Sequence, residues 1–258
     1  MYLPIATQQT CVAAWLEAVA AVNAVPGHEA HNVIIDVAEP LNQSVADACV
    51  IDIADSFLRT HGTLPVQSVA NTIFPEALYR QYGAPDFIDK FHKELLPKIR
   101  GTKRWSGYYF ERMTAYPAHG EEPLNQLWGI VERIRDEGNK SRNKFELSLF
   151  DPESDIDNSP YGGQCLSFLS FKLLRGPEKR LTLTALYRNH YYIQKLLGNL
   201  IGLGRLMIFV AKESGVGVGP LTVISTHAYI DLPKSARRGD INKLISDCQA
   251  AQKLSAAA

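Results

Sequence analysis

The chain has 258 residues, of which 46% are hydrophobic and 21% are charged. This is the composition of an ordinary globular protein, with room for one large α/β-type domain or two small ones. The 27 basic and 27 acidic side chains cancel, so no overall field favours nucleic acid or an anionic membrane as a partner. Any anion has to be bound by a local group of residues.

The four cysteines are widely scattered and include no CxxC pair; they are Cys11, Cys49, Cys165 and Cys248. This pattern argues against a metal centre or a disulfide framework and favours reduced thiols in a cytoplasmic protein. The early apolar stretch 11–25 is interrupted by Glu17 and Asn23 and follows no basic segment, so we expect no signal peptide. We also expect no segment that approaches the roughly 20 apolar residues of a membrane span.

Periodicity and turn residues predict the following elements in chain order. They are a helix at 8–24, a strand within 31–40, helices at 45–59, 66–79 and 85–99, a helix at 122–136, strands at 145–150, 166–174 and 181–187, a helix at 190–214, a strand at 221–231 and a helix at 239–254. Pro75 is expected to begin a new helix. Residues 175–179 carry the turn chemistry of a hairpin loop.

Helices followed by several consecutive strands indicate an α+β fold with a mixed or antiparallel sheet flanked by helices. A regular βαβ alternation is absent from the predicted order. No break in composition and no repeat divides the sequence. We therefore expect a single domain over residues 1–258.

Several side chains could carry chemistry, although each alone has an ordinary structural explanation. Cys165 follows Gln164 at the start of a predicted strand, where a buried core thiol is the common case. Arg188 leaves the end of an apolar strand, where a guanidinium could clamp a phosphate with two hydrogen bonds. The tripeptide at 141–143 (SRN) is, by itself, a basic surface turn.

Two further segments place polar groups among apolar neighbours. Asn199 lies in an otherwise apolar helix, so its amide serves either packing or recognition of a ligand. His227 and Tyr229 are two residues apart and project from one face of a strand. Each of these groups could also be a satisfied core residue.

Taken in order, the segments SRN, QC, YR, GN and THAY resemble the thymidylate synthase family, which includes the pyrimidine hydroxymethylases. Arg188 and Asn199 are eleven residues apart, and Gly217 and His227 are ten apart, both as in that family. The resemblance is clearest over 107–231. It implies a thymidylate-synthase-like fold, a homodimer formed through a sheet face and 5,10-methylenetetrahydrofolate as one-carbon donor.

The resemblance implies a role for each matching residue. Cys165 aligns with the nucleophile that adds to C6 of a pyrimidine ring, a step that needs a thiolate and therefore a cationic neighbour. Arg188 aligns with the arginine that grips the 5′-phosphate beside this cysteine. Arg142 aligns with a phosphate-binding arginine donated by the other subunit. Asn199 aligns with the reader of O4 and N3, and the pair His227 and Tyr229 with the groups that bind the sugar 3′-hydroxyl.

The sequence also departs from the family pattern on the substrate side. Asn143 stands where the family has a second arginine, and Asn189 stands at the substrate-binding serine position. Leu166 replaces a histidine after the nucleophile, and Lys195 replaces a glycine. Asn71 occupies the position of a catalytic glutamate, although an amide cannot act as a general acid or base.

The folate side departs further. Tyr191 stands where the family has an aspartate that contacts the folate pterin, and the tail 252–258 lacks the family's C-terminal segment that closes over folate. The N-terminal phosphate-binding loop is not visible either. Use of the folate cofactor is therefore left open by the sequence.

These observations lead to two alternatives. The first is a divergent transferase acting at C5 of a pyrimidine nucleoside 5′-monophosphate by Cys165 addition at C6, with methyl or hydroxymethyl transfer. The amide of Asn199 favours a uracil-type ring, because it can donate to O4 and accept from N3–H. The second is a catalytically altered or inactive nucleotide-binding dimer with a regulatory role.

Overall fold

The computed structural model describes residues 2–100, 108–118, 122–156 and 163–256. Residue 107, where the family resemblance begins, and the last two residues of the tail lie outside these ranges.

A mixed sheet forms the centre of the fold. Its strands are β1 (Leu3–Pro4), β2 (Glu29–Val37), β3 (Phe145–Ser148), β4 (Leu166–Leu173), β5 (Arg180–Tyr187), β6 (His190–Tyr191) and β7 (Gly217–Tyr229). The strand order is β1-β2-β7-β5-β4-β3, and β6 pairs with β7. The β2–β7, β3–β4 and β4–β5 pairs are antiparallel, whereas β1–β2, β5–β7 and β6–β7 are parallel. The expected α+β class with a mixed sheet is confirmed.

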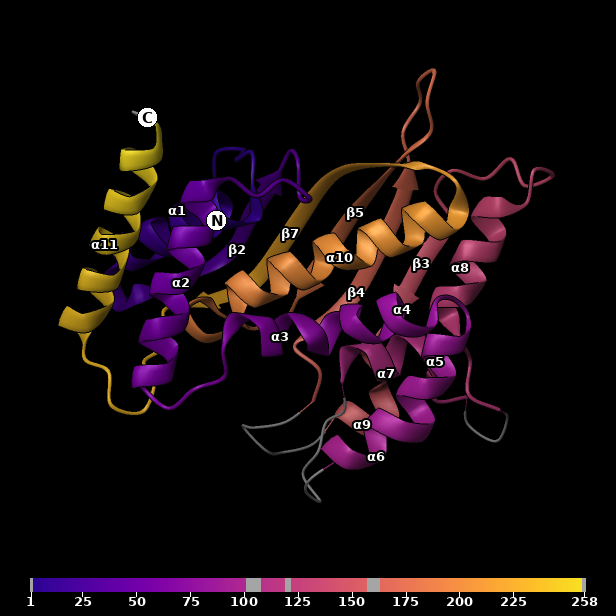
Figure 1. Ribbon diagram of the computed structural model, residues 1–258, viewed down its shortest axis with the longest axis horizontal. Helices are drawn as coiled ribbons and strands as arrows, with labels where there is room; N and C mark the ends of the chain where they lie inside the picture. Colours follow the sequence, from indigo (N-terminus) through magenta and orange to yellow (C-terminus); the bar gives the residue numbers. More distant parts are fainter. Residues whose placement is uncertain (1, 101–107, 119–121, 157–162, 257–258) are drawn as a thin grey trace.

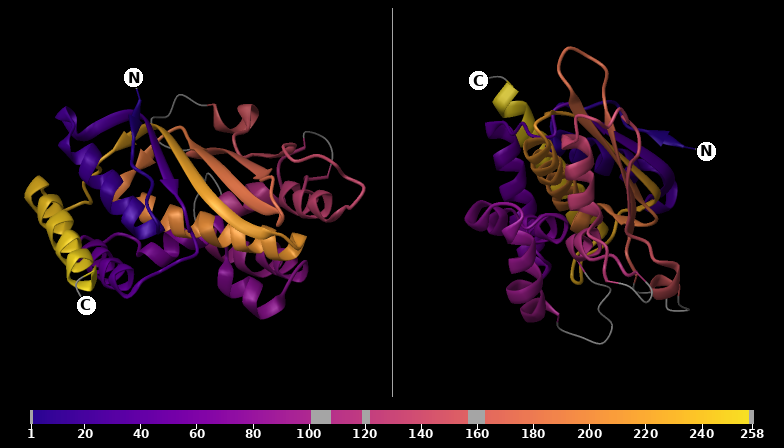
Figure 2. Two further views of the ribbon diagram at one scale, coloured as in Figure 1. Left: turned by 90° about the horizontal axis from the view of Figure 1, so that it is seen from above. Right: turned by 90° about the vertical axis from the view of Figure 1, so that its right-hand side faces the viewer.

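The helices gather mainly on one side of this sheet. They are α1 (Cys11–Ala24), α2 (Val45–Thr60), α3 (Val66–Ile73), α4 (Glu76–Tyr82), α5 (Asp86–Lys90), α6 (Leu96–Ile99), α7 (Tyr109–Thr114), α8 (Gln126–Arg135), α9 (Pro152–Asp155), α10 (Leu197–Ser214) and α11 (Arg238–Ala256). In Figure 1, α10 runs across the strands, with α1 and α2 toward one end and α8 toward the other. Figure 2 shows the same arrangement from two other sides.

The predicted elements largely match, with two instructive differences. The helix expected at 190–214 begins later, because His190 and Tyr191 pair with β7 and residues Tyr192–Leu196 form a π-helical turn before α10. The short helices α7 and α9 were not predicted, since six and four residues are too few to show a period. Pro75 ends α3 and begins α4, as expected.

The helix α10 is the most apolar element of the fold. The stretch Tyr192–Ser214 is long and apolar enough to cross a membrane, with a mean hydropathy of 1.4, but 72% of that window is buried inside the fold. The expectation that no segment approaches a membrane span was therefore wrong, because this stretch has the length and the apolar composition of one. The burial is that of a core helix, packed against α3, α1 and the sheet.

Close approach of α10 to α3 depends on Gly198. A Cβ atom at this position would lie 2.5 Å from Val69 Cβ and 2.8 Å from Val66 O. Both contacts are shorter than van der Waals separation, so α3 would have to move. The absence of a side chain at Gly198 thus sets the position of the neighbouring Asn199.

We expect Gly198→Ala to destabilise the protein by about 1–3 kcal/mol or more, because overpacking a rigid contact forces backbone shifts. Urea unfolding at pH 7 measures this change. Gly129→Ala is the matched control: it also lies in a helix, with nothing within 4 Å of an added Cβ, and should be neutral or stabilising by up to about 1 kcal/mol. Equal stability of the two variants would show that the α3–α10 contact yields easily.

Candidate functional site

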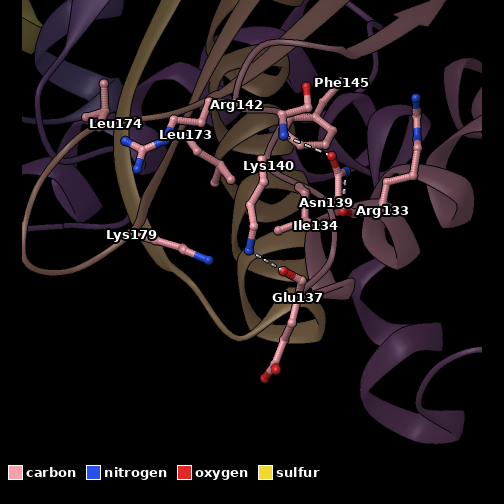
Figure 3. A pocket seen from close by; sticks show the side chains of 11 residues that line it. Arg133, Ile134, Glu137, Asn139, Lys140, Arg142, Phe145, Leu173, Leu174 and Lys179 are labelled. Atoms are coloured by element: carbon pink, nitrogen blue, oxygen red, sulfur yellow. Dashed lines mark hydrogen bonds between the residues drawn. The ribbon is translucent and has the colours of Figure 1, made fainter.

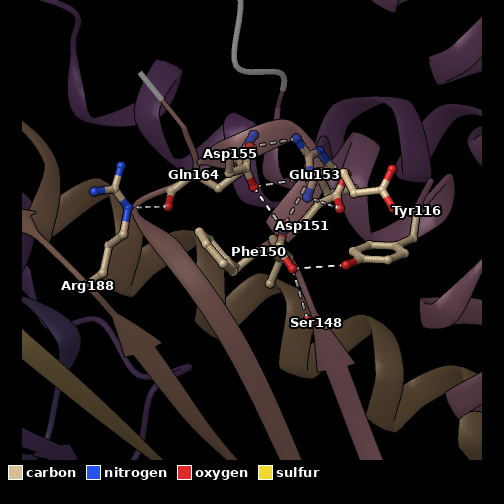
Figure 4. A network of polar contacts seen from close by, with 10 residues as sticks. Tyr116, Ser148, Phe150, Asp151, Glu153, Asp155, Gln164 and Arg188 are labelled. Atoms are coloured by element: carbon tan, nitrogen blue, oxygen red, sulfur yellow. Dashed lines mark hydrogen bonds and ion pairs between the residues drawn. The ribbon is translucent and has the colours of Figure 1, made fainter. Parts of the chain in front are cut away.

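Cys165 and Arg188 lie side by side because the antiparallel β4–β5 pair brings the start of one strand to the end of the other. Leu166 is the partner of Tyr187 in this pair, so the flanking residues Cys165 and Arg188 are neighbours. The Arg188 N–H donates to the Cys165 carbonyl oxygen at 2.9 Å. Its Nε–H donates to the Gln164 carbonyl oxygen at 3.0 Å (Figure 4). The structure thus brings the proposed nucleophile and the proposed phosphate clamp together.

Gly163 makes room for this guanidinium. Its φ of +68° lies in the left-handed region, and a Cβ atom there would be 3.2 Å from Arg188 Nη2. Asp155 closes the other side through its carbonyl oxygen, 3.6 Å from the same point. Asp155 is itself held by an ion pair with Arg112 at 2.9 Å, and both side chains are largely buried. The turn before Cys165 therefore rests on a fixed polar network.

The charge state of Cys165 results from two opposing effects. Burial raises the pKa of the thiol, while Arg188 and Lys195 lower it. The net shift is upward, so the cationic neighbours only partly offset burial. Arg188 therefore acts in the direction that favours the thiolate, against the larger effect of burial.

Two tyrosines also approach Cys165, and neither was predicted from the sequence. Burial and the Cys165 thiol both raise the pKa of Tyr109 on α7, and Arg188 and the backbone N–H groups of Cys165 and Leu166 lower it. The rings of Tyr109 and Tyr187 lie 6.4 Å apart at their centroids, in an edge-to-face arrangement. Tyr187 is fully buried and its hydroxyl has no hydrogen-bond partner among the described residues.

Asn199 belongs to a buried hydrogen-bonded chain. Asn199 Nδ2 lies 2.9 Å from His190 Nε2, and His190 Nδ1 lies 3.0 Å from Ser225 Oγ. The Tyr192 hydroxyl donates to the same Ser225 Oγ at 3.2 Å. The His190 ring stacks on Tyr187 with centroids 3.9 Å apart. This stack links Asn199 to the surroundings of Cys165.

Burial lowers the pKa of His190 to about 3, whereas histidine in an unfolded chain titrates near 6.5. Below about pH 6.5 the unfolded chain binds a proton at this histidine that the folded chain does not. The free energy of unfolding is therefore unaffected by this residue above about pH 6.5 and decreases as the pH falls from there toward 3. For these two pKa values we expect the unfolding free energy to drop by about 2–3 kcal/mol between pH 7 and pH 4.5 because of this residue.

Urea unfolding at both pH values measures the drop, and His190→Phe should lack this part of it. His61→Gln, outside the buried chain, serves as the control and should retain the wild-type drop. An unchanged drop in His190→Phe would contradict the neutral, buried state of this ring.

His227 and Tyr229 lie at the end of β7 beside β2 and β6. His227 Nδ1 lies 2.8 Å from Asn189 Oδ1, and its Nε2 lies 3.3 Å from Glu29 Oε2. Tyr229 pairs with Tyr191 on β6, and their ring centroids are 6.5 Å apart. Three predicted substrate-binding residues, Asn189, His227 and Tyr229, therefore gather at the sheet end that also carries Arg188.

Arg142 and Asn143 lie at the opposite end of β4. The Arg142 carbonyl oxygen accepts from the Leu173 N–H at 2.9 Å, and Leu173 ends the strand that Cys165 precedes. Eight residue steps at about 3.3 Å place these two ends roughly 26 Å apart. Arg142 shares a surface pocket with other cationic side chains, among them Lys140 and Lys179 (Figure 3). Within one chain it cannot reach the Cys165 site.

Asn71 lies on α3 and, in the part of the chain that the structure describes, has no hydrogen bond to Cys165. Its Oδ1 accepts from Gln67 Nε2 at 3.3 Å on α3. It lines a pocket with residues that include Phe91 and Tyr108, and Cys165 is not part of that lining. The glutamate-like catalytic role that its aligned position implies receives no support from this placement.

No protein-family model matches the chain. It is 31% identical over 150 residues to a protein of Methanocaldococcus jannaschii named as a putative thymidylate synthase, covering 56% of this chain and 64% of that relative. Proteins of the same name from Methanothermobacter marburgensis and Methanothermobacter thermautotrophicus are 28% identical over 167 residues and 26% identical over 204 residues. The shares covered are 65% of this chain and 67% of the first of these two, and 78% and 77% for the second.

Over the aligned regions the chain is similar to proteins named as putative thymidylate synthases. The aligned region spans 64% of the length of the M. jannaschii relative, so the similarity is distant and partial. The mixed sheet with helices on one side is consistent with a thymidylate-synthase-like fold.

The folate position does not match what the family resemblance implies. Tyr191 is 38% exposed, and its phenol offers one hydrogen-bonding group in place of a carboxylate. It cannot pair with a pterin as two carboxylate oxygens would. Tyr191 therefore does not fit folate bound as it is in the family, and the reaction proposed for this chain does not depend on that cofactor. Among the described residues, no group of three or more His, Cys, Asp or Glu side chains could hold a metal ion.

Proposed function

We propose that the chain is a thymidylate-synthase-like transferase that acts at C5 of a pyrimidine nucleoside 5′-monophosphate in the cytoplasm. The observation that carries the proposal is the joining of Cys165 and Arg188 at adjacent strand ends, hydrogen-bonded through the backbone. A thiol next to a guanidinium matches a substrate that carries both an electrophilic ring and a phosphate. The similarity to proteins named as thymidylate synthases supports the same chemistry.

The reaction proposed begins with the Cys165 thiolate. Its sulfur adds to C6 of the ring, the C5–C6 π electrons move toward the C4 carbonyl, and C5 becomes nucleophilic. C5 then attacks an aldehyde-level one-carbon electrophile, whose π electrons move onto its oxygen, which is protonated. Water takes up the C5 proton, and elimination of the sulfur from C6 restores the double bond and the thiolate and leaves a hydroxymethyl group; a methyl product would require instead an electrophilic methyl donor whose leaving group departs. Burial that raises the thiol pKa favours a thiol that ionises only when Arg188 and a bound substrate are in place.

Each remaining residue has a binding role in this proposal. Arg188 binds the 5′-phosphate, and Asn199 reads the ring edge. Asn189, His227 and Tyr229 form the sugar side, where His227 Nδ1–H is oriented by Asn189 Oδ1 at 2.8 Å. Of the family's second arginine, only the amide of Asn143 remains, so it adds at most a neutral hydrogen bond.

We infer that two chains pair through the open face of the sheet. Phe168, Leu186, Ile224 and Ile34 stand in register across four strands, and all four are partly exposed. A row of apolar side chains across a sheet face suits an obligate interface. Such a dimer would supply Arg142 to the partner's site, which explains why it lies far from Cys165 in its own chain.

One observation favours the second candidate function, a nucleotide-binding dimer without catalysis. The net upward shift of the Cys165 pKa and the amide at Asn71, which cannot act as a base, leave the described site without an assigned general base. A regulatory binder would need Arg188 and Asn199 but no thiolate.

The deciding experiment incubates the protein with uridine, deoxyuridine, cytidine and deoxycytidine 5′-monophosphates, with and without methylenetetrahydrofolate. Release of tritium from C5 reports addition at C6, and the mass of the nucleotide reports one-carbon transfer. Tritium release that requires Cys165 would support the enzyme. Binding without release would support the binder, and no binding of any nucleotide would overturn both.

The dimer is tested with mixed dimers. When Arg142→Ala is paired with an Arg188→Ala chain, one site keeps both arginines and one loses both if Arg142 acts across the interface. We expect half of the sites to bind nucleotide with normal affinity. A monomer in solution, or two equally weakened sites, would reject the shared site.

A further inference from the structure

The orientation of the Asn199 amide is coupled to the position of the proton on its neighbour His190. Asn199 is 3% exposed, His190 is 2% exposed and Ser225 is fully buried. Because burial keeps the His190 ring neutral, the ring carries one proton. With Nδ2 of Asn199 donating to Nε2 at 2.9 Å, that proton resides on Nδ1, which donates to Ser225 Oγ at 3.0 Å.

Turning the amide over would place Oδ1 against an unprotonated Nε2, with two lone pairs facing each other. The turn is permitted only if the His190 proton moves from Nδ1 to Nε2. Ser225 would then donate its own hydroxyl proton to Nδ1 and still accept the Tyr192 hydroxyl at 3.2 Å, so the hydrogen-bonded chain reverses as a unit. The orientation of Asn199 is therefore tied to the tautomer of His190.

In the orientation observed, the amide leaves unused hydrogen-bonding groups in a buried site. Asn199 Oδ1 is buried and has no partner among the described residues, although buried polar atoms are almost always paired in folded proteins. The second N–H of Nδ2 also remains available. An amide with one side held and the other unsatisfied is suited to a ligand that supplies one donor and one acceptor side by side.

Pyrimidine rings offer this pair in two opposite orders. A uracil ring has an acceptor at position 4 and a donor at position 3, whereas a cytosine ring has a donor at position 4 and an acceptor at position 3. An amide free to turn over would accept either ring. An amide held in one orientation accepts one ring and rejects the other, because the wrong ring sets donor against donor and acceptor against acceptor.

We propose that His190 and Ser225 are positioning residues that set the orientation of the Asn199 amide and thereby make the site discriminate between a uracil-type and a cytosine-type ring. The inference rests on the proposed function, since it assumes that Asn199 meets a pyrimidine. It adds to that function two residues that do not touch the ring but determine which ring is bound. The Tyr187 stack, with ring centroids 3.9 Å apart, keeps His190 in the plane that this positioning role requires.

The test measures dissociation constants for uridine and cytidine 5′-monophosphates, each in the ribo and deoxy form. For the wild-type protein we expect the uracil nucleotides to bind at least about tenfold more tightly than the cytosine nucleotides. In His190→Phe, which keeps an aromatic ring on Tyr187 but has no nitrogen, this ratio should fall toward one. Ser225→Ala leaves Nδ1 without a partner, lets the proton move to Nε2, and should lower the ratio as well.

Two further measurements separate positioning from general damage. Ser214→Ala removes another buried hydroxyl at the end of α10, for which the described residues supply no hydrogen-bond partner, and should leave the ratio unchanged. The ¹⁵N chemical shifts of His190 should report a proton on Nδ1 and an unprotonated Nε2 at pH 7, and this signature should be lost in Ser225→Ala. The shifts can be measured even if His190→Phe does not fold.

The outcomes test the proposed function and the positioning role of His190 and Ser225 separately. If no pyrimidine nucleotide binds, the proposed function fails. If nucleotides bind but the wild-type ratio is near one, or survives both substitutions, the positioning role is wrong while the function stands. A proton on Nε2 in the wild-type protein would also overturn the positioning role as described.

Discussion

Replacing Cys165 with alanine is expected to lower the rate of C5 tritium release by more than about 10³-fold while changing nucleotide affinity only a few-fold, because the thiolate forms the covalent bond on which the later steps depend. Cys165→Ser should be nearly as inactive, since an alkoxide is far harder to form at neutral pH than a thiolate. Stopped-time tritium release at saturating nucleotide, alongside calorimetric binding, gives both quantities.

The other cysteines provide controls for this substitution. Cys49 is exposed and Cys11 is buried, and burial raises the pKa of Cys11 to about 12. Cys49→Ala should leave both rate and binding unchanged. Cys165→Ala with wild-type tritium release would reject the nucleophile, whereas equal loss of binding and rate would indicate a structural role for the thiol.

Replacing Arg188 with alanine should weaken binding of a nucleoside 5′-monophosphate by roughly 30-fold to several thousand-fold, the range for losing one partner of a charge-assisted contact. Binding of the corresponding nucleoside, which has no phosphate, should change much less. The comparison isolates the phosphate contact from any change in the ring site. Arg188→Lys should recover part of the affinity, because it keeps the charge and loses the two-pronged geometry.

Arg180 supplies a matched control at the other end of β5. Its Nε–H donates to the Val218 carbonyl oxygen at 3.0 Å, much as Arg188 donates to Gln164 O at 3.0 Å. Arg180→Ala therefore removes a similar strand-end hydrogen bond without removing the proposed clamp. Equal losses of nucleotide affinity in the two variants would show that Arg188 acts on the fold and not on the phosphate.

Arg188 also influences the thiol next to it. Its charge lowers the Cys165 pKa against the larger upward effect of burial. Arg188→Ala should therefore slow alkylation of Cys165 by iodoacetamide near pH 8, where the thiolate fraction controls the rate. A faster reaction would mean that the substitution exposes the thiol more than it discharges its surroundings.

Much of the architecture could be predicted because long helices and strands show a clear hydrophobic periodicity in the sequence. The strand runs at β4, β5 and β7 and the helix α10 all carry apolar patterns long enough to recognise. The pairing that joins Cys165 to Arg188 follows from a hairpin between adjacent strands, which the turn residues at 175–179 indicate. The order and spacing of the segments SRN, QC, YR, GN and THAY then suggested substrate-binding and catalytic roles that no single segment could suggest.

The parts that could not be predicted depend on contacts between distant segments. His190 lies nine residues before Asn199, and no helical or strand period pairs them, because the chain changes from strand to π-helical turn between them. Tyr109 reaches Cys165 from a helix of only six residues. The one available signal for His190 was a polar, titratable side chain between an apolar strand and an apolar helix.

Arg142 shows a second limit of prediction from one sequence, which concerns contacts between subunits. Its sequence position suggested a phosphate ligand, but its place at the far end of β4 becomes intelligible only with a second chain. A single sequence holds no direct signal for which residues act across an interface. The separation of Arg142 from Cys165 by the length of a strand is what the cross-subunit role implied by the family resemblance requires.

That separation has a consequence for how the protein would behave on dilution. In the proposed dimer, Cys165 of one site lies just before β4, and β4 ends beside the Arg142 that serves the other site. A single chain therefore contains part of each of the two sites and no complete site. Specific activity should then fall when the protein concentration drops below the dimer dissociation constant, and the loss should be reversed by adding chains that lack Cys165 but keep Arg142. An inert chain would thus act as an activator of its dilute, intact counterpart.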